Sequence, residues 1–451
     1  MNRFVLLCGG LLFLTTSCTK LLDEKSDKSL VIPSTLKDLQ ALLDNYNYLG
    51  FNDPGAGEVS STDYYLTDED YQSMSADEDK RMYTWQPDHL FAPSSNQWMF
   101  GYRAIYYANS ALSSLEDIPL TGSNSFDFNN VKGQAYFYRA KFLFNMAVVW
   151  VLAYDRNTTS DILGLPLRTG TDFNEPSVRS NQKETFELII SDLKQAIPCL
   201  PETPIHVMRP SKPAAYAQLA KVYLYMQDYQ NAGLYADSCL QLQHELINYN
   251  DVDTSRAYSF DNFNEEVIMH SVIGTPAPLN ISRAKISPDL YALYADGDLR
   301  KQVFFKLNSD GSHAFKGSYS GTMAPFGGLS VNEILLIRIE ALTRANELDE
   351  AAGLLKTLYE KRWDGNSAIP SFEGMDQRQL LSFVLEERRR ELPMRGVRWY
   401  DIKRLNKEGA NIHLSRMVEG QEYSLPANDP RTALPLPEDV IALSGMQQNP
   451  R

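Results

Sequence analysis

Cysteine and histidine are scarce in this chain of 451 residues, which contains four cysteines and six histidines. The histidines are scattered without the spacing of metal ligands, and we expect them to be solvated or packed in the core. Cys8 and Cys18 belong to the N-terminal segment, while Cys199 and Cys239 lie on apolar faces of predicted helices, where cysteine behaves as a small hydrophobic residue. A disulfide between the latter two is left open, because an oxidising compartment permits it and the sequence does not decide it.

Motifs for common enzyme chemistry are also missing. The chain has no Walker loop, no glycine-rich dinucleotide fingerprint and no His-Glu-x-x-His, and the segment GSYSG fails as a nucleophile elbow because Tyr319 occupies its centre. Two aspartate pairs lack the glycine and distal glutamate of an EF-hand loop, namely Asp251 with Asp253 and Asp296 with Asp298. We therefore predict no enzyme, no metal site and no cofactor, although the many carboxylates leave a glycosidase pair open.

Basic residues are outnumbered by acidic ones. The chain has 43 Lys and Arg against 57 Asp and Glu, a formal net charge of −14. An acidic surface argues against nucleic acid as a partner, because that binding depends on neutralising phosphates. Hydrophobic residues make up 43% and aromatic residues 11% of the chain, with 25 tyrosines. The chain can therefore bury a large core, and its tyrosines are the first indication of a ligand.

Long apolar runs are absent beyond Leu14, so we predict no membrane-spanning helix. Before that point, Arg3 and the apolar run FVLLCGGLLFL describe a secretory signal over residues 1–17. The letters LTTSC at its end resemble a loose lipobox, which predicts cleavage before Cys18 and a thioether-linked diacylglycerol with an N-terminal acyl chain (palmitate) on that cysteine. The alternative is ordinary cleavage nearby with a free thiol. Residues 18–33 are polar and aperiodic, which predicts a flexible tether.

The remainder, residues 34–451, is predicted to be one mainly α-helical domain. Helical periodicity covers residues 34–249 and 331–405 and indicates a scaffold. Residues 250–330 combine short strands, polar loops and regularly placed aromatics, and residues 406–451 form a C-terminal tail. An irregular region of this length inside a compact protein is usually functional or disordered, and the aromatics favour a functional one.

Helical hairpins of tetratricopeptide type are expected within the scaffold. In AYAQLAKVYLYMQDYQNAGLYADSCLQL, small residues such as Ala220 and Ala232 let two antiparallel helices approach each other. A degenerate second copy, ILLIRIEALTRANELDEAAGLLKTLYEKR, has its turn near Asn346. Lys132–Asp155 and Gln182–Pro198 predict a third hairpin, divided by an insertion. Such hairpins cannot bury their apolar faces alone, so we expect them to stack.

The most densely charged stretch is FVLEERRRELPMRGVRWYDIKRL, at Phe383–Leu405, with seven basic and four acidic side chains. Helical spacing places Arg388 on the apolar face within a turn of Glu387 and Glu391. The charges are interleaved, whereas a phosphate-binding patch would carry one sign. We therefore predict a structural lattice of buried ion pairs rather than an anion site.

This stretch, continued to FVLEERRRELPMRGVRWYDIKRLNKEG, resembles the segment ER..EL..EG.RW.DL.R near the C-terminus of the SusD/RagB family (starch-utilization-system D-like) of outer-membrane nutrient-binding lipoproteins. The tail LPLPEDVIALSGMQQNP resembles the family's closing PIP..E...N..L.QNP. GQAYFYRAKFLFNMAVVW, YALYADGDLRKQ and YLYMQDYQNA match as well, as does the lipidated N-terminus. Met394 departs from the pattern, standing where the family has an acidic residue before Arg395, and the chain is short for the family.

The resemblance implies a protein without bond chemistry. Such a protein is anchored by lipid to the outward face of the outer membrane, captures an oligosaccharide or peptide and delivers it to a SusC-like TonB-dependent barrel. Its partners are then that barrel, the ligand and the membrane, and not nucleic acid. The matched motifs belong to the scaffold, so they do not identify the ligand. Two alternatives stay open: a surface glycoside hydrolase, and a tetratricopeptide adaptor in the cell envelope that binds only proteins.

Aromatic side chains outside clear helical stripes are the predicted ligand surface. Sugar rings pack their flat C–H faces on such rings and need polar partners at their edges. The predicted aromatic residues are Tyr64, Tyr65, Trp85, Trp98, Tyr258, Phe260, Phe263 and Tyr319, and the predicted hydrogen-bond partners are Arg256, Asn262 and Asn264. Trp98, at the start of a helix, fits a ligand role or a core role. For each ring the alternative is an aromatic that merely caps the core.

Overall fold

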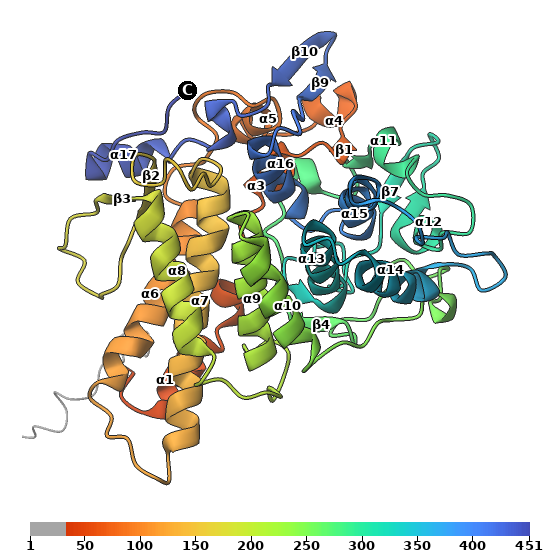
Figure 1. Cartoon of the computed structure of the whole chain (residues 1–451). Coiled ribbons are helices and arrows are strands. Elements are labelled where there is room, and N and C mark those ends of the chain that lie inside the picture. The colour runs from red at the N-terminus through yellow and green to blue at the C-terminus, as the bar shows by residue number, and fades with distance from the viewer. Residues whose placement is uncertain (1–32) are drawn as a thin grey trace, which may run out of the picture.

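The computed structural model describes residues 33–451. The predictions for residues 1–17 and for Cys18, and nearly all of the predicted tether, concern residues outside this range. The described chain is mainly helical, as predicted, and its strands form short antiparallel sheets of two strands each. Figure 1 shows the long helices side by side across the molecule.

The first three long helices pack in sequence order. α6 (Gln97–Leu115) packs on α7 (Ser125–Trp150), and α7 packs on α8 (Gln182–Ala196), which confirms the hairpin predicted for the latter two. α6 and α7 pack closely at Gly101. A Cβ atom there would lie 2.5 Å from the Sδ atom of Met146, so a larger residue would require the Met146 side chain to move.

Capping boxes fix the starts of two helices. In each, the cap side chain pairs with an acidic side chain three positions later, which satisfies two backbone amides at once. The caps are Thr35 for α1 (Leu36–Leu43) and Asn181 for α8.

Both tetratricopeptide-like hairpins are present. They are α9 (Lys212–Tyr225) with α10 (Tyr229–Leu240), and α13 (Val331–Arg344) with α14 (Leu348–Arg362). Asn346 makes the turn of the second hairpin with a φ of +65°, a conformation that asparagine tolerates better than most residues. The hairpins stack through α10 and α13, where a Cβ on Gly233 would lie 2.8 Å from the Cβ of Ala341. Small residues at the contact therefore allow the stacking that the sequence predicts.

Shorter elements complete the chain. The remaining α-helices are α2 (Tyr46–Leu49), α3 (Ala56–Ser60), α4 (Asp68–Gln72), α5 (Asp77–Tyr83), α11 (Pro288–Tyr291), α12 (Arg300–Phe304), α15 (Gln377–Glu391), α16 (Val397–Lys407) and α17 (Glu438–Ser444). The strand pairs are β1 (Tyr64–Tyr65) with β5 (Lys285–Ile286), β2 (Leu163–Pro166) with β3 (Arg179–Asn181), β4 (Val267–Met269) with β8 (Leu329–Ser330), β6 (Phe305–Leu307) with β7 (His313–Phe315), and β9 (Leu414–Val418) with β10 (Gln421–Leu425).

The two cysteines of the described chain are free thiols. Cys199 is half-buried and Cys239 is fully buried. Burial raises the pKa of Cys239 to about 12, because an apolar environment disfavours the thiolate. This thiol therefore packs as a small hydrophobic residue.

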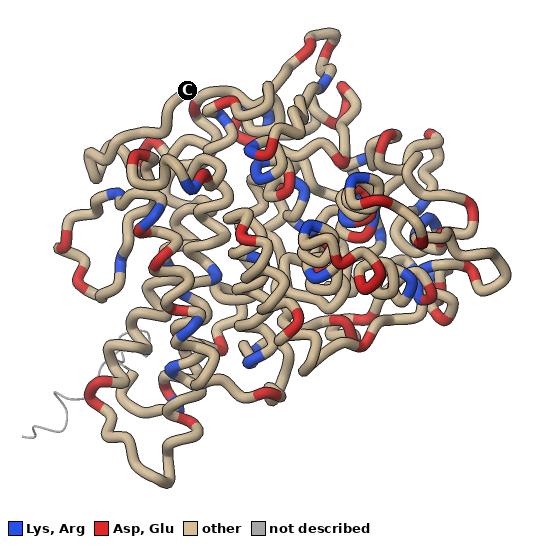
Figure 2. Tube along the Cα trace, in the orientation of Figure 1, with Lys and Arg blue, Asp and Glu red and all other residues tan. Residues whose placement is uncertain are grey.

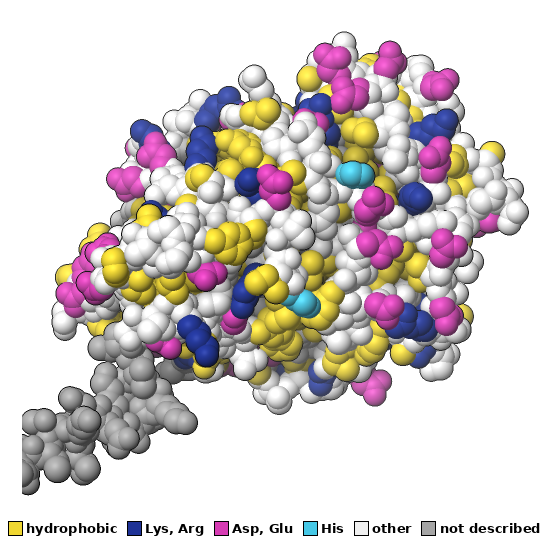
Figure 3. All heavy atoms as spheres, turned by 90° about the horizontal axis from the view of Figure 1, so that it is seen from below, with side chains coloured by type: hydrophobic (Ala, Val, Ile, Leu, Met, Phe, Trp, Pro, Cys, Tyr) yellow, Lys and Arg dark blue, Asp and Glu magenta, His cyan; other side chains and the backbone are white. Residues whose placement is uncertain are grey.

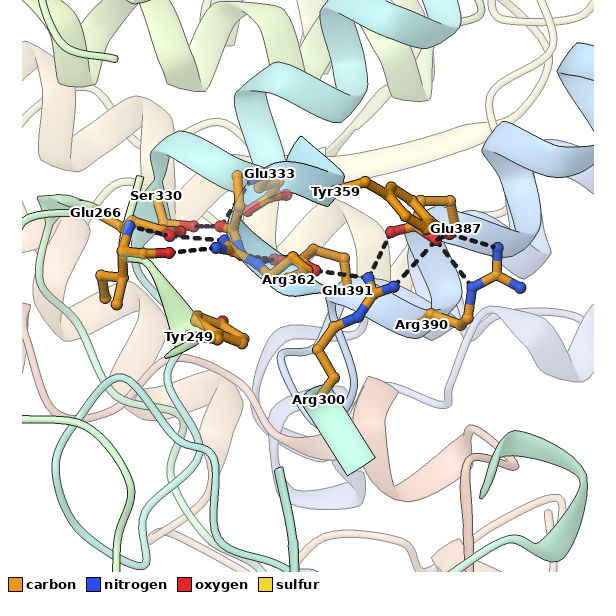
Figure 4. A network of polar contacts seen from close by, with 12 residues as sticks. Tyr249, Glu266, Arg300, Ser330, Glu333, Tyr359, Arg362, Glu387, Arg390 and Glu391 are labelled. Carbon is orange, nitrogen blue, oxygen red and sulfur yellow. Dashed lines mark hydrogen bonds and ion pairs between the residues drawn. The ribbon is translucent and has the colours of Figure 1, made fainter. Parts of the chain in front are cut away.

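Ion pairs are concentrated where α12 to α16 meet. Figure 2 shows basic residues gathered on α13, α15 and α16, while acidic residues also mark many outer loops. The close-up in Figure 4 shows how the buried charges connect. Arg362 donates to Glu391 at 2.8 Å and to Glu266 at 2.6 Å, and Arg300 donates to Glu391 at 2.8 Å and also to Glu387. All five side chains are buried, which confirms the predicted structural lattice.

Arg388 belongs to this region but has different partners from those predicted. Its Nε atom donates to Asp401 at 2.9 Å, and its Nη2 atom lies 3.6 Å from Glu333. The prediction that it pairs with Glu387 or Glu391 is wrong. Successive side chains of an α-helix point about 100° apart, so Arg388 faces α13 and α16 while the two glutamates face α12 and α14.

The lattice keeps its carboxylates ionised in spite of burial. Burial alone would disfavour the charge on Glu387, but Arg300 and Arg390 outweigh it and lower the pKa of Glu387 to about 2. Arg404 and Arg344 likewise lower the pKa of Glu340 to about 2 against the effect of burial. The lattice thus holds the helices together through charges that each depend on a partner.

Candidate functional site

Most of the predicted aromatic residues are not on the surface. Tyr64, Trp85, Phe260 and Tyr319 each expose 3% or less of their area. Their polar tips already have partners: the Tyr64 hydroxyl donates to Val59 at 2.9 Å, and the Trp85 indole donates to a backbone carbonyl at 3.0 Å. In this structure these four rings cap the core, which is the alternative that the sequence left open, and they offer no face to a ligand.

The predicted polar partners lie on one exposed loop and largely bind to it. Arg256 forms an ion pair with Asp261 at 2.7 Å, and the Asn264 amide donates to the carbonyl of Asp261 at 3.2 Å. Asn262 is exposed and Tyr258 is half-buried on the same loop. None of these four residues lines either of the two pockets described below.

Phe263 is the exception on this loop, because its ring is partly exposed and its backbone is unusual. Its φ is +61° and 39% of its area is accessible. A bulky residue in the left-handed region costs of order 1–3 kcal/mol and is most often found at functional positions. Its ring meets those of His206 at 4.5 Å and His270 at 4.8 Å between centroids. Figure 3 shows several patches of hydrophobic side chains on the face of the molecule seen from below.

A larger aromatic pocket lies elsewhere, at the α6 helix. Its volume is about 770 Å³, within the range of small-molecule sites. It is enclosed by α6, by the segment 168–177 and by α17, and Figure 1 places these elements on the left of the molecule. Trp98 is the one predicted residue in its lining, through the small part of the ring that stays exposed.

The rings of this pocket form two contacting pairs. Trp98 and Tyr102 have centroids 4.9 Å apart, and Tyr106 and Phe173 have centroids 4.9 Å apart with planes tilted by 33°. Tyr102 and Tyr106 are four residues apart, so they share one face of α6. Phe173 is 78% exposed although it is large and apolar. Phe173 therefore presents most of its ring to solvent, and Tyr102 and Tyr106 are partly exposed beside it.

A chain of buried polar contacts holds the outer wall of the pocket in place. The Asn109 amide on α6 donates to the carbonyls of Arg168 at 2.9 Å and Gly170 at 3.2 Å. Asn109 is itself oriented by Arg139, which donates to its oxygen at 3.0 Å. Arg139 in turn binds Asp192 through two bonds of 2.7 Å. Charges on α7 and α8 thus fix the segment that carries Phe173.

Further contacts close the segment on itself and on α6. The Arg168 guanidinium donates to the carbonyls of Asp172 and Glu175. The Tyr102 hydroxyl donates to the carbonyl of Pro166 at 2.9 Å, and burial holds the pKa of Tyr102 well above its usual range. The tyrosine is therefore a neutral hydrogen-bond donor with a fixed ring, as a stacking platform requires.

Polar groups accompany the rings in the lining of the pocket. The Arg103 guanidinium lies 4.8 Å from the Tyr48 ring centroid, and Asn96 and Asp439 also line the pocket. Asp439 is the only carboxylate among the described residues of the lining. Glycosidases use two carboxyl groups that flank the scissile bond, about 5–10 Å apart. The described lining does not present such a pair.

The sequence signals for these residues differ in strength. Tyr102 and Tyr106 lie in GYRAIYYAN, whose helical periodicity does not distinguish a ligand-facing ring from a core ring. Phe173 stands alone in the polar loop TGTDFNEP. Aromatics in polar loops indicate a ligand surface in residues 250–330, and the same pattern in the insertion after α7 indicates Phe173.

Residues 33–451 contain neither a metal-ligand cluster nor a helix suited to span a membrane. In that range no three or more His, Cys, Asp or Glu side chains are grouped to hold a metal ion. None of the helices there combines the length and the apolar character needed to cross a membrane.

Comparisons with known proteins give consistent results. A family model described as starch-binding and associating with the outer membrane matches residues 20–224. The SusD-like protein P2 of Formosa agariphila is 26% identical over 417 residues, an alignment that covers 78% of this chain and 79% of that protein. A second protein of the same organism, SusD-like protein P38, is 22% identical over 390 residues and covers 69% of this chain and 72% of its own.

Solved structures share the fold over nearly the whole chain. A SusD superfamily protein from Bacteroides thetaiotaomicron has a TM-score of 0.75 and 22% identity, and the match covers 92% of this chain and 100% of that one. A SusD-like carbohydrate binding protein from Bacteroides vulgatus has a TM-score of 0.64 and 19% identity, with 87% and 89% covered. At these identities the structural similarity establishes the fold.

Proposed function

This chain belongs to the SusD-like family, and on that premise we propose that it captures an oligosaccharide at the outer surface of the outer membrane and delivers it to a SusC-like TonB-dependent barrel. In this proposal Cys18 carries the lipid anchor, and the described domain works by binding alone, without an enzymatic step. A peptide ligand remains the alternative within the same role.

The observation that carries the proposal is the aromatic pocket on α6. Tyr102, Tyr106 and Phe173 offer flat apolar faces of the kind on which the C–H faces of sugar rings pack. Arg103 supplies hydrogen-bond donors at the rim, where sugar hydroxyls would lie. The outer wall is already fixed by Asn109 and its partners, so little ordering is needed when a ligand binds.

The other predicted ligand residues keep a secondary place in the proposal. Tyr65 and Phe263 retain exposed ring area and are proposed to contact distal parts of a long ligand. The tetratricopeptide-like hairpins are proposed to seat the barrel, because stacked hairpins present extended surfaces suited to protein partners.

The test is a calorimetric titration of the purified chain with a panel of neutral oligosaccharides. Replacing Phe173 or Tyr106 by alanine is expected to weaken binding roughly 2- to 10-fold per ring, as the loss of one aromatic contact predicts. Phe126→Ala is the matched control, since Phe126 is also exposed, at 62%, but lies outside the pocket. Thermal melts should be unchanged for Phe173→Ala. Equal affinities for all variants, or release of sugar by the purified protein, would reject the proposal.

A further inference from the structure

A second pocket, of about 350 Å³, lies between β1, α11 and β9 on the far side of the α15 helix from the ion-pair lattice. Its lining includes Tyr65, Asp289, Arg389, His413 and Arg416. Figure 1 shows β1, α11 and β9 together at the upper right, well away from α6. No part of the aromatic pocket described above contributes to it.

The most informative residue of this pocket is Arg416. It is 6% exposed, and its guanidinium donates to the backbone carbonyls of Val59 at 2.8 Å and of Ser61 and Tyr83. The guanidinium carbon lies 3.8 Å from the Tyr83 ring centroid and 4.6 Å from that of Trp85. Among the described residues it has no carboxylate partner, and its Nε atom has no hydrogen-bond partner. A nearly buried positive charge without an anion is uncommon, because burying an ion is costly.

Two further arginines share a single carboxylate beside this charge. Arg389 donates through Nε to Asp63 at 2.8 Å, and Arg398 lies 3.7 Å from the same oxygen. Asp63 is 2% exposed at its side chain, whereas Arg389 is 21% exposed and reaches the pocket. Arg389 contacts Asp63 through Nε and Nη2, which leaves its Nη1 atom for a ligand.

The charges around the pocket therefore do not balance. The lining contains two guanidinium groups, those of Arg389 and Arg416, and one carboxylate, that of Asp289, which is exposed. Asp63 and Arg398 lie behind Arg389 and do not line the pocket. Glu58 lies deeper, and burial together with the nearby Asp63 raises its pKa to about 7, so it carries only part of a negative charge near neutral pH. In a protein whose formal net charge is −14, a locally positive pocket indicates a specific anionic ligand.

We propose that this pocket binds the anionic group of an acidic saccharide, either a carboxylate or a sulfate ester. Arg389 presents Nη1, the nitrogen that Asp63 does not bind, as a charged hydrogen-bond donor to an oxyanion, and Arg416 supplies the positive field behind it. Tyr65 and the exposed His413 flank the entrance, where a sugar ring would find a stacking face and a further donor. This inference rests on the proposed function and specifies the chemical class of its ligand.

The position of the arginines on α15 separates this site from the lattice. Arg388 and Arg390 point into the buried ion pairs. Arg389, between them, points to the opposite side and pairs with Asp63 before β1. The charged stretch thus contains both a structural lattice and one side chain available to a ligand.

The test compares a trigalacturonate, a sulfated galactose trisaccharide and a neutral galactose trisaccharide in calorimetric titrations. We expect the acidic sugars to bind about 10-fold or more tightly than the neutral one, as charge-assisted hydrogen bonds predict. The preference should shrink between about 0.05 M and about 0.5 M NaCl, because salt screens a partly exposed charge pair. Whichever acidic sugar binds more tightly identifies the source of the oxyanion.

Variants of the pocket residues test whether the preference for acidic over neutral sugars arises at this pocket. Arg389→Gln and His413→Gln should each reduce the preference for acidic sugars, and Arg389→Lys should restore part of it because the charge remains without the planar fork. The matched control is Arg209→Gln: Arg209 is 25% exposed and pairs with Asp44 through two bonds, at 2.8 and 2.6 Å, but lies outside this pocket. If Arg389→Gln unfolds, His413→Gln decides alone, since His413 is exposed and forms no ion pair among the described residues.

Three results would overturn the inference. They are equal affinity for acidic and neutral sugars, a preference unaffected by both Gln variants, and equally tight competition by an acidic peptide, which would show that the ligand is not a saccharide. Failure of the acidic-sugar inference can be distinguished from failure of the proposed function, because the proposed function is tested with neutral sugars and with Phe173→Ala. A protein that binds neutral sugars through Phe173 but shows no acidic preference retains its function and loses only this inference.

Discussion

Arg362→Ala tests the ion-pair lattice at an arginine whose loss leaves a buried carboxylate without any other cation among the described residues. Arg362 is fully buried and binds Glu266 at 2.6 Å, Glu391 at 2.8 Å and the carbonyl of Ile247 at 2.7 Å. In Arg362→Ala, Glu391 keeps Arg300 at 2.8 Å as a partner. Glu266 has no other cation among the described residues. One buried carboxylate is therefore left without compensation.

The expected loss is about 3–5 kcal/mol in the free energy of unfolding, the usual cost of leaving a buried charge without its partner. That is a large share of the roughly 5–15 kcal/mol of a typical domain. Arg344→Ala is the control, because Arg344 is 17% exposed and its buried partner Glu340 keeps Arg404 at 2.7 Å. We expect that control to cost less than about 1 kcal/mol.

The pH dependence of Arg362→Ala provides an independent check. Burial already raises the pKa of Glu266 against the opposing effect of Arg362, and loss of the arginine should raise it further. A carboxyl group whose pKa is raised in the folded state binds more protons when folded, so stability falls as pH rises through the interval between its unfolded and folded pKa values. The deficit relative to wild type should therefore be largest above neutral pH and shrink toward pH 5.

Equilibrium denaturation with urea, at several pH values, measures these differences. Adding Glu266→Gln to Arg362→Ala should recover part of the loss, because the amide carries no charge and its oxygen can still accept from Tyr319, now 2.9 Å from the carboxylate. The reasoning is refuted if Arg362→Ala unfolds within about 1 kcal/mol of wild type, or if its deficit grows as pH falls.

Three further outcomes follow from named contacts. Arg388→Ala should destabilise the protein by about 3 kcal/mol in denaturation, at the low end of the range for a broken buried pair, because Asp401 keeps a second arginine at 2.8 Å. Glu58→Gln should remove roughly 3 kcal/mol of pH dependence between pH 4.5 and pH 8, since a pKa raised to about 7 makes the wild type less stable as pH rises. Cys18→Ala should give a protein that no longer fractionates with membranes when the barrel is absent, because the acyl chains are the proposed anchor.

The helical scaffold could be predicted from the sequence because its signals are local. Alanines spaced along α9 and α10 indicate close helix packing, and Asn346 marks a turn in the second hairpin. Interleaved charges on α15 predict a lattice, but its partners could not be identified. Arg300 and Glu266 come from segments far away in the chain, and only the tertiary fold brings them to Glu391.

The candidate site was harder to predict because a sequence does not distinguish an aromatic that covers the core from one that faces solvent. Trp85 and Tyr319 lie outside helical stripes, yet the loops that carry them fold back on the scaffold and bury both. Tyr106 is the reverse case. It lies in a helix with a buried pattern, but its ring is partly exposed and contacts Phe173 of the neighbouring segment. Exposure of a ring depends on which distant segment covers it, and no local pattern records that.

Hydrogen–deuterium exchange with and without a bound oligosaccharide tests the central claim most directly, because it locates the ligand without altering the protein. The ligand is to be chosen from the titration panel as the neutral sugar that binds most tightly. We predict slower exchange in residues 168–177 and at the N-terminal half of α6, where the ligand would cover the pocket. Protection confined to residues 253–265, with none at 168–177, would contradict the account and return the site to the aromatic loop.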